Sequence, residues 1–158
     1  MLAFNMGDKI FQYRAAAIII QDGYVLLQEF PRHGSYWALP GGRVDPMETS
    51  ENSVRREMME ELNSDCNIIR QVYFMENFFN HKGIKYHEIG SYFEVELLDE
   101  KLKDKNRDHY GVEGDEDLRF CWFKLTELSE ITLYPEFLRE GLLKLPETLT
   151  KIVENRAD

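Results

Sequence analysis

One short helix with three glutamates near its end is the feature that the rest of this chain must fold around. Glu57, Glu60 and Glu61 share a narrow strip of the helix surface, because successive residues turn by about 100°. Like charges at this spacing destabilise an isolated helix by roughly 0.2–0.5 kcal/mol per pair. A divalent cation would relieve the repulsion, since Mg²⁺ prefers oxygen ligands. The alternative is that this acidic face of the helix simply lies in water. The residues that flank the helix distinguish between the two interpretations.

The residues around the glutamates predict where this helix begins and how it is held. Thr49 or Ser50 suits the N-cap position, where a hydroxyl accepts a hydrogen bond from a free backbone N–H. Val54, Met58 and Leu62 recur every four residues and predict one buried stripe. That stripe would fix the direction of the neighbouring carboxylates, as a metal site requires.

The spacing of these residues follows a known signature. Gly42 is followed after five residues by Glu48, and after seven more by Arg56 to Glu61, which reads Arg-Glu-Met-Met-Glu-Glu. This arrangement resembles the Nudix box, the signature of the Nudix hydrolase family, at its full internal spacing. The usual ending is a glycine and an aliphatic residue, where this chain has Asn63 and Ser64. Asn adopts the left-handed conformation that closes a helix, so that exchange is mild.

Strands before and after the acidic helix indicate an α/β layered domain. The resemblance sharpens this to a Nudix α/β/α sandwich with a mixed central sheet, matched from Arg14 to about Leu145, in a single domain of residues 1–158. It implies hydrolysis of the diphosphate linkage in a nucleoside diphosphate joined to another moiety X, with water attacking phosphorus. Mg²⁺ or Mn²⁺ would be required, because cations neutralise the diphosphate oxygens and orient the water.

The resemblance also implies roles for individual residues. The expected metal ligands are the side chains of Glu57, Glu60 and Glu61 and the carbonyl of Gly41. Arg56 would orient Glu57 through a charge-assisted hydrogen bond, and Glu48 would brace the junction between the loop and the helix. The general base would be a box glutamate or a distant acid, for which the candidates are Glu88, Glu113 and Glu116. Each of these three taken alone is more often a surface acid.

Composition limits the partners of the chain. Its 158 residues suit one domain with a single core, and 29 acidic against 19 basic residues give a net charge of -10. Nucleic acid and anionic membranes attract basic surfaces, so neither is an expected partner. The N-terminus has no signal pattern and no apolar stretch reaches membrane-spanning length, so we expect a cytoplasmic protein. Cys66 and Cys121 lie in predicted strands and are expected to be buried free thiols.

Apolar runs predict two hairpins. Ile10 to Ile20 and Tyr24 to Phe30 flank the Asp22-Gly23 turn signal, and the continuous apolarity of the first run predicts a strand covered on both faces. Asn67 to Asn80 and Ile84 to about Leu98 predict the second hairpin.

Two groups of aromatic and polar residues have more than one interpretation. Tyr86, Glu88, Tyr92 and Glu94 share one face of a predicted strand, which could line a cleft or meet water, and water is the commoner outcome. Trp37 could stack on a base, but an aromatic residue before a tight turn more often joins the core.

The remaining segments are expected to be loops, one strand and closing helices. Pro31 to Ser35 predicts a short loop, and the charged stretch from Asp99 to Asp117 predicts a long exposed loop of the kind that often covers a site. Leu118 to Lys124 predicts a strand. Pro135 to Leu145 predicts a closing helix, and Pro146 to Val153 a second helical segment.

Two other functions are compatible with a Nudix-like sequence. A non-catalytic nucleotide-binding or regulatory module commonly loses box acids, whereas this chain keeps them all. An isomerase of isoprenoid diphosphates would have a degenerate box and a suitably placed catalytic cysteine. Because the box of this chain is nearly intact, hydrolysis is the favoured function. Residues that mark a preference for ADP-ribose, diadenosine polyphosphates or NADH are missing where they would be expected, around Phe79 to Lys82. Nucleoside triphosphates and nucleotide sugars therefore stay open as substrates.

Overall fold

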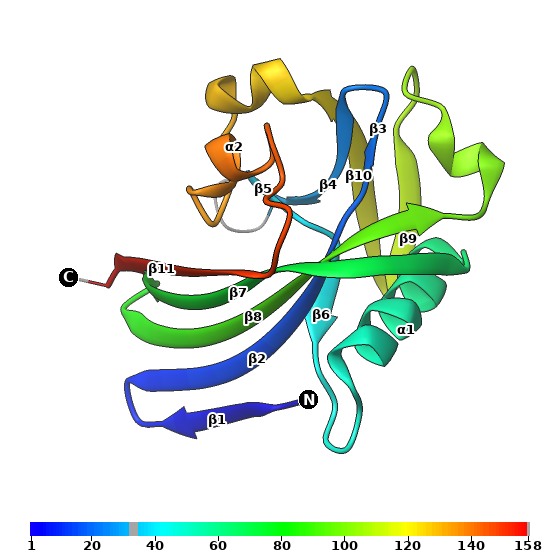
Figure 1. The fold of residues 1–158 in the computed structure, drawn as a ribbon. Coiled ribbons are helices and arrows are strands. Elements are labelled where there is room, and N and C mark those ends of the chain that lie inside the picture. The colour runs from blue at the N-terminus through cyan, green and yellow to red at the C-terminus, as the bar shows by residue number, and fades with distance from the viewer. Residues whose placement is uncertain (32–34, 158) are drawn as a thin grey trace.

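Two β-sheets and the helix between them position the acidic residues (Figure 1). The computed structural model describes residues 1–31 and 35–157. The helices of this part are α1 (Ser50–Leu62), η2 (Glu100–Lys103), η3 (Leu125–Glu130) and α2 (Leu138–Gly141), of which η2 and η3 are 3₁₀ helices. The predicted loop from Pro31 to Ser35 falls on residues 32–34, which lie outside the described residues.

Sheet A has six strands within the described residues, in the order β1-β2-β8-β7-β11, with β6 paired to β2. Their bounds are β1 Ala3–Met6, β2 Lys9–Ile18, β6 Gly41–Arg43, β7 Cys66–His81, β8 Ile84–Leu97 and β11 Thr150–Arg156. The pairs β2–β8 and β7–β11 are parallel and the others are antiparallel. Sheet A is therefore the mixed sheet that the sequence analysis predicted.

Sheet B has five strands in the same described part, in the order β3-β4-β10-β9, with β5 paired to β4. Their bounds are β3 Ile20–Gln21, β4 Tyr24–Phe30, β5 Tyr36–Ala38, β9 His109–Glu113 and β10 Glu116–Lys124. Figure 1 shows sheet A as a curved layer from which sheet B rises, with α1 and α2 on different sides of the junction. The first predicted hairpin therefore divides between the sheets: β2 belongs to sheet A, and β3 pairs with β4 in sheet B.

The two faces of β2 contribute to two separate parts of the core. Ala15 and Ala17 belong to a cluster that contains the apolar stripe of α1 and residues of both sheets. Ala16 and Ile18 belong to a second cluster, which contains Leu138 of α2. The predicted burial of this strand on both faces is confirmed, because both of its faces are packed.

The acidic helix has the ends and the buried stripe that the sequence predicts. The Thr49 hydroxyl accepts the backbone N–H of Asn52 at 3.2 Å, and Asn63 ends the helix in the left-handed conformation with φ 52°. Val54 and Met58 of the stripe are fully buried. Because the stripe packs between the sheets, the carboxylates next to it are held in fixed directions.

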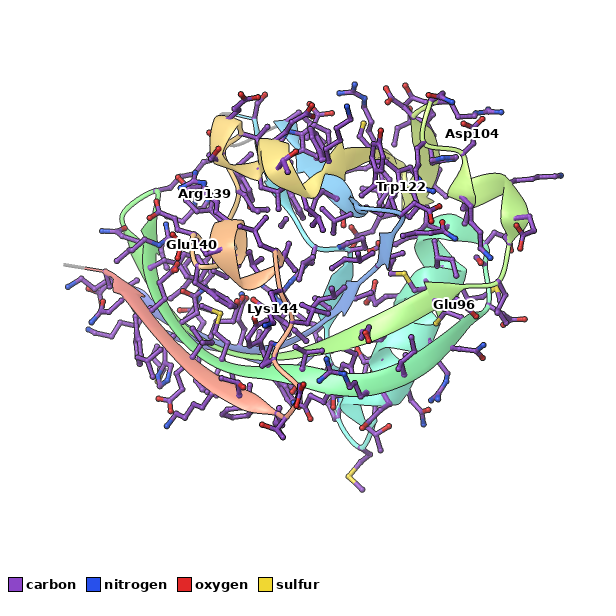
Figure 2. The ribbon with its side chains drawn as sticks, turned by 45° about the horizontal axis from the view of Figure 1, so that its top comes forward. Glu96, Asp104, Trp122, Arg139, Glu140 and Lys144 are labelled. Carbon is purple, nitrogen blue, oxygen red and sulfur yellow. The ribbon has the colours of Figure 1, made fainter. Side chains whose placement is uncertain are left out.

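The segment from Asp99 to Asp117 is not the long exposed loop that its charge predicts. It contains η2 and β9, and β9 pairs with β10 along its whole length. Trp122 of β10 donates its indole N–H to the Leu102 carbonyl at 2.9 Å, and Figure 2 shows Trp122 on the side of the molecule that carries Asp104. The prediction is wrong because pairing and packing with distant residues outweigh the local charge density.

Of the two helical segments predicted near the C-terminus, the first contains only a short helix and the second is wrong. Helix α2 has only four residues, and β11 replaces the second segment as a strand parallel to β7. Glu154 of β11 accepts the backbone N–H groups of Glu136 and Phe137 at 3.1 and 2.9 Å. These bonds hold the segment before α2 against β11.

Two smaller expectations can be compared with the structure. Cys66 and Cys121 are buried and free, as predicted. Trp37 packs against the second core cluster, with its ring 4.7 Å from that of Phe123, which agrees with the interpretation as a core residue. In the described part of the chain, no helix has the length and apolarity needed to cross a membrane.

Candidate functional site

Helix α1 directs two of the three glutamates near its end inward. Glu57 and Glu61 are 8% and 4% exposed, whereas the Glu60 side chain is 58% exposed. Burial, and then the adjacent Glu57 carboxylate, raises the pKa of Glu61 to about 9. Glu61 Oε2 is buried without a hydrogen-bond partner among the described residues. A divalent cation would satisfy this oxygen and compensate the charge of the pair.

The glycine pair before the helix leaves the space that this arrangement needs. A Cβ atom at Gly42 would lie 2.3 Å from Glu57 Oε1, so no side chain fits there while Glu57 keeps its position. A Cβ atom at Gly41 would lie 2.2 Å from the Ala15 carbonyl oxygen of β2. Both glycines therefore permit close approach, one to a carboxylate and the other to a neighbouring strand.

Arg56 ties the helix to the loop before it. Its Nε and Nη2 donate to the two carboxylate oxygens of Glu48 at 2.8 and 3.0 Å, and Nη2 also donates to the Arg43 carbonyl at 3.2 Å. Its Nη1 donates to Glu57 at 2.9 Å and to Glu60 at 3.2 Å. The hydrogen bond from Arg56 lowers the pKa of Glu48 to about 2. The structure thus places Arg56 against Glu57, and Glu48 at the junction of loop and helix.

The arrangement fits a metal ion at two of the expected side chains. Glu57 and Glu61 approach each other, whereas Glu60 is directed towards Arg56 and solvent. No three His, Cys, Asp or Glu side chains gather closely enough to hold a metal ion in residues 1–31 and 35–157. Glu57 and Glu61 therefore fit a cation as they stand, and Glu60 would have to turn away from Arg56 to join them.

The three distant base candidates lie in different places. A Cβ atom at Gly111 of β9 would lie 1.7 Å from the Glu61 carbonyl oxygen, so β9 packs directly against the end of α1. Glu113 follows on the same strand, and its charge adds to the burial that raises the pKa of Glu61. Glu116 is the pairing partner of Glu113 on β10, and both are exposed. Glu88 lies apart from them, on β8.

A cavity of about 430 Å³ is lined by residues of both sheets, on the face of β2 that carries Ala16. Its aromatic walls include two stacked pairs, Phe30 with Tyr36 at 5.0 Å and Phe79 with Tyr86 at 4.8 Å between ring centroids. Tyr86, Glu88 and Tyr92 line this cavity, so the expectation that their face of the strand meets water is wrong. It is wrong because residues of sheet B cover this part of sheet A.

Two arginines stand between the cavity and the acids. Arg14 and Arg43 are pairing partners on β2 and β6, and both line the cavity. Arg14 donates to the Leu39 carbonyl at 2.8 Å, and its positive charge opposes the burial that raises the pKa of Glu61. A diphosphate that reached from the cavity to the acids would pass these guanidinium groups, which suit phosphate oxygens.

Seven polar residues of the cavity had no role predicted from the sequence, and they are Gln12, Arg14, Arg43, Asn77, Asn80, His81 and Arg156. A signal for two of them was present, because Gln12 and Arg14 occupy alternate positions of an otherwise apolar strand. Arg43 and Asn77 had no comparable local signal, since only the pairing of the strands brings them to the same face.

Comparison with known proteins agrees with this fold. The family model described as NUDIX domain matches residues 11–144. A search of curated proteins found no match. A NUDIX hydrolase from Nitrosomonas europaea has a similar solved structure, with a TM-score of 0.63 and 20% identity over 90% of this chain and 79% of that chain.

Two further solved structures show the same likeness. An ADP-ribose pyrophosphatase from Streptococcus suis matches with a TM-score of 0.60 and 18% identity, over 89% of this chain and 98% of that chain. A MutT protein from Bacillus halodurans matches with a TM-score of 0.58 and 20% identity, over 91% and 90%. These likenesses confirm the predicted fold, and the family match covers most of the sequence. The chain belongs to the NUDIX domain family.

Proposed function

We propose that this protein is a divalent-metal-dependent hydrolase that cleaves the diphosphate linkage of a nucleoside diphosphate joined to another moiety X. The observation that carries the proposal is the inward-facing pair of Glu57 and Glu61, with its unpartnered buried oxygen and with Arg14 nearby. The similar ADP-ribose pyrophosphatase acts on a substrate of this chemical class. The name of that protein supports this class of substrate and does not identify the moiety X for this chain.

The metal would be held at the end of α1. Glu57 and Glu61 are the ligands that fit directly, and Glu60 and the Gly41 carbonyl complete the proposed set. When bound, Mg²⁺ or Mn²⁺ neutralises the diphosphate oxygens and lowers the pKa of a bound water. Arg56 keeps Glu57 directed at this position, and Glu48 holds Arg56 through its two-pronged hydrogen bond.

The attacking water needs a group that accepts its proton. Glu88, Glu113, Glu116 and the box glutamates are the proposed acceptors. Glu113 has the strongest support among the distant three, because its charge acts on Glu61 across the short separation between β9 and α1. Single changes of the three distant residues to Gln would separate them, since loss of the base removes a rate-limiting ionisation from the pH profile of kcat.

The substrate would be a small molecule, and the cytoplasm is the proposed location. The net charge of -10 disfavours nucleic acid and anionic membranes, whose own negative charge would repel the protein. Arg14 and Arg43 are cationic residues of the cavity, and they lie where the diphosphate would pass.

The test is release of phosphate from a panel of nucleoside diphosphate derivatives, with a phosphatase added to reveal the products. Turnover of one class only with Mg²⁺ or Mn²⁺, and its loss in Glu57→Gln and Glu61→Gln, is the expected result. Full activity in both variants would overturn the site. No turnover of any derivative, together with a nucleotide-dependent rise in Tm, would favour a non-catalytic binding module.

A further inference from the structure

The floor of the cavity carries a buried polar cluster, which includes Glu88, one of the proposed proton acceptors. Glu88 and Asn77 are 5% and 3% exposed, and they are pairing partners on β8 and β7. Resting on the proposed function, we propose that these two side chains recognise the nucleoside of the substrate. They would select a base that presents a ring N–H beside an amino group, as guanine does.

The hydrogen bonds of the cluster leave acceptors towards the ligand. Glu88 accepts a bond from Gln12 Nε2, and a second from Asn77 Nδ2 at 3.4 Å. A carboxylate has about four acceptor positions, so roughly half stay available. Because the amide nitrogen of Asn77 faces the carboxylate, its Oδ1 faces elsewhere, and this oxygen is buried without a partner among the described residues. A ligand that satisfies this floor must supply N–H donors.

The charges of the cavity determine which way the substrate enters. The Glu88 carboxylate would repel a phosphate group, whereas Arg14 and Arg43 would attract one. A third arginine of the cavity, Arg156, is paired with Glu154 at 2.9 Å, which compensates its charge. Arg43 Nε donates to Gln12 Oε1 at 2.9 Å, and Gln12 in turn donates to Glu88. This chain of hydrogen bonds holds the cationic and anionic ends of the cavity in fixed positions. The diphosphate would lie at the arginines, near α1, and the neutral base at Glu88.

Aromatic residues stand next to the proposed base position. Phe79 and Tyr86 are the pair of residues two positions beyond Asn77 and Glu88 on the same strands. Their stacked rings form part of the cavity wall, and the stacked Phe30 and Tyr36 of sheet B form another part. Stacking on an aromatic ring stabilises every base to a similar extent, because each base has a π-face. Discrimination between bases must therefore come from the polar floor.

This role differs from that of a general base. Glu88 is fixed by two amide groups on sheet A, whereas Glu57 faces Gly42 on the other side of β2. An adenine or a uracil would offer this floor only one donor group, and hypoxanthine lacks the amino group of guanine. The guanine edge uses both the carboxylate and the free oxygen of Asn77.

The experiment is calorimetric binding of GMP, IMP, AMP and UMP without metal, which involves no diphosphate bond and no turnover. GMP should bind most tightly, and IMP roughly 10- to 100-fold more weakly, because it leaves buried acceptors unpaired. Glu88→Gln should abolish the preference for GMP over IMP. The matched control is Glu96→Gln, an exposed glutamate on the same strand outside the cavity, labelled in Figure 2, which should keep it.

The outcomes separate this proposal from the hydrolysis. Equal binding of the four nucleotides, or binding of none, would overturn base recognition, and so would an unchanged preference in Glu88→Gln with an unchanged Tm. Asn77→Ser, which keeps a small polar side chain, provides a second variant and should also reduce the preference. If Glu88→Gln loses turnover but keeps the preference in binding, Glu88 serves the chemistry instead. A guanine preference without any turnover would overturn only the hydrolysis.

Discussion

Glu57 and Glu61 show at the scale of single residues how a site can oppose the stability of the chain that carries it. Their carboxylates approach each other inside the protein, and one oxygen of Glu61 has no partner in the described part of the structure. Burial of an unpartnered polar group costs roughly 1–3 kcal/mol in proteins. The apolar stripe of α1 and the bonds from Arg56 offset this cost and keep both acids in place.

Glu61→Gln should therefore make the metal-free protein more stable while it abolishes metal binding. At pH 8 we expect the free energy of unfolding to rise by about 1–2 kcal/mol, because a neutral amide replaces a buried acid. Mg²⁺ should raise the Tm of the unchanged protein and have little effect on the variant. Denaturant unfolding with and without Mg²⁺ measures both effects. If Glu61→Gln is less stable than the unchanged protein without metal, the buried acid does not destabilise the fold.

The ion pair of Glu48 and Arg56 should make the free energy of unfolding depend on pH. The pKa of Glu48 is about 2 in the folded protein, below its ordinary value of 4.5. Ionised Glu48 therefore stabilises the folded state above pH 4.5, and this contribution is lost as the pH falls towards 2. Glu48→Gln should be less stable than the unchanged protein at neutral pH, and the difference should shrink on acidification. Urea unfolding at several pH values measures it, and a difference that does not vary with pH would contradict it.

At the scale of elements, α1 and the β7–β8 hairpin could be predicted because their signals are local. Thr49, Asn63 and the four-residue spacing of apolar residues define the helix without help from the rest of the chain. Strand β9 had no such signal, since Tyr110 and Val112 are exposed and the segment is rich in charge. Its pairing with β10 and its contact with α1 are long-range. The cavity was missed for the same reason, as strand pairing alone brings Asn77 opposite Glu88.

The contact between β9 and α1 can be tested at Gly111. A Cβ atom there would overlap the Glu61 carbonyl oxygen, which belongs to helix backbone and cannot move freely. We expect Gly111→Ala to lower the free energy of unfolding by about 2 kcal/mol or more and to reduce turnover, because the end of α1 would shift. The control is Val112→Ala, which changes an exposed neighbour and should alter stability by at most about 0.5 kcal/mol. Equal effects of the two changes would refute the close packing.

At the scale of the whole molecule, the cavity depends on how the two sheets are placed relative to each other. One aromatic pair, Phe30 and Tyr36, comes from sheet B, and the other, Phe79 and Tyr86, comes from sheet A. The segment before α2 closes the space, and Glu154 of the C-terminal strand holds that segment. Parts of the chain that lie far from the acidic helix in sequence therefore determine which substrate can reach it.

Glu154→Ala should consequently affect substrate binding more than chemistry. It removes the acceptor of two backbone N–H groups and the partner of Arg156, whose Nε donates to Glu154 at 2.9 Å. We expect KM to rise severalfold with kcat nearly unchanged, because the wall of the cavity loosens while α1 keeps its contacts. Steady-state kinetics measures the two constants. Val153→Ala, an exposed change on the same strand, is the control, and a fall in kcat alone would contradict the prediction.

The alternation of side chains along β2 has a consequence for how such a protein diversifies. Gln12 and Arg14 point to the cavity, while Ala15 and Ala17 pack in the cluster that holds the apolar stripe of α1. Mutations at the first set change what is recognised, and mutations at the second set disturb the support of the acids. Selection can therefore act on the two properties separately along one strand, except at Arg14, whose charge also acts on Glu61. Lineages that descend from such an ancestor can acquire new substrates while they inherit the same reaction.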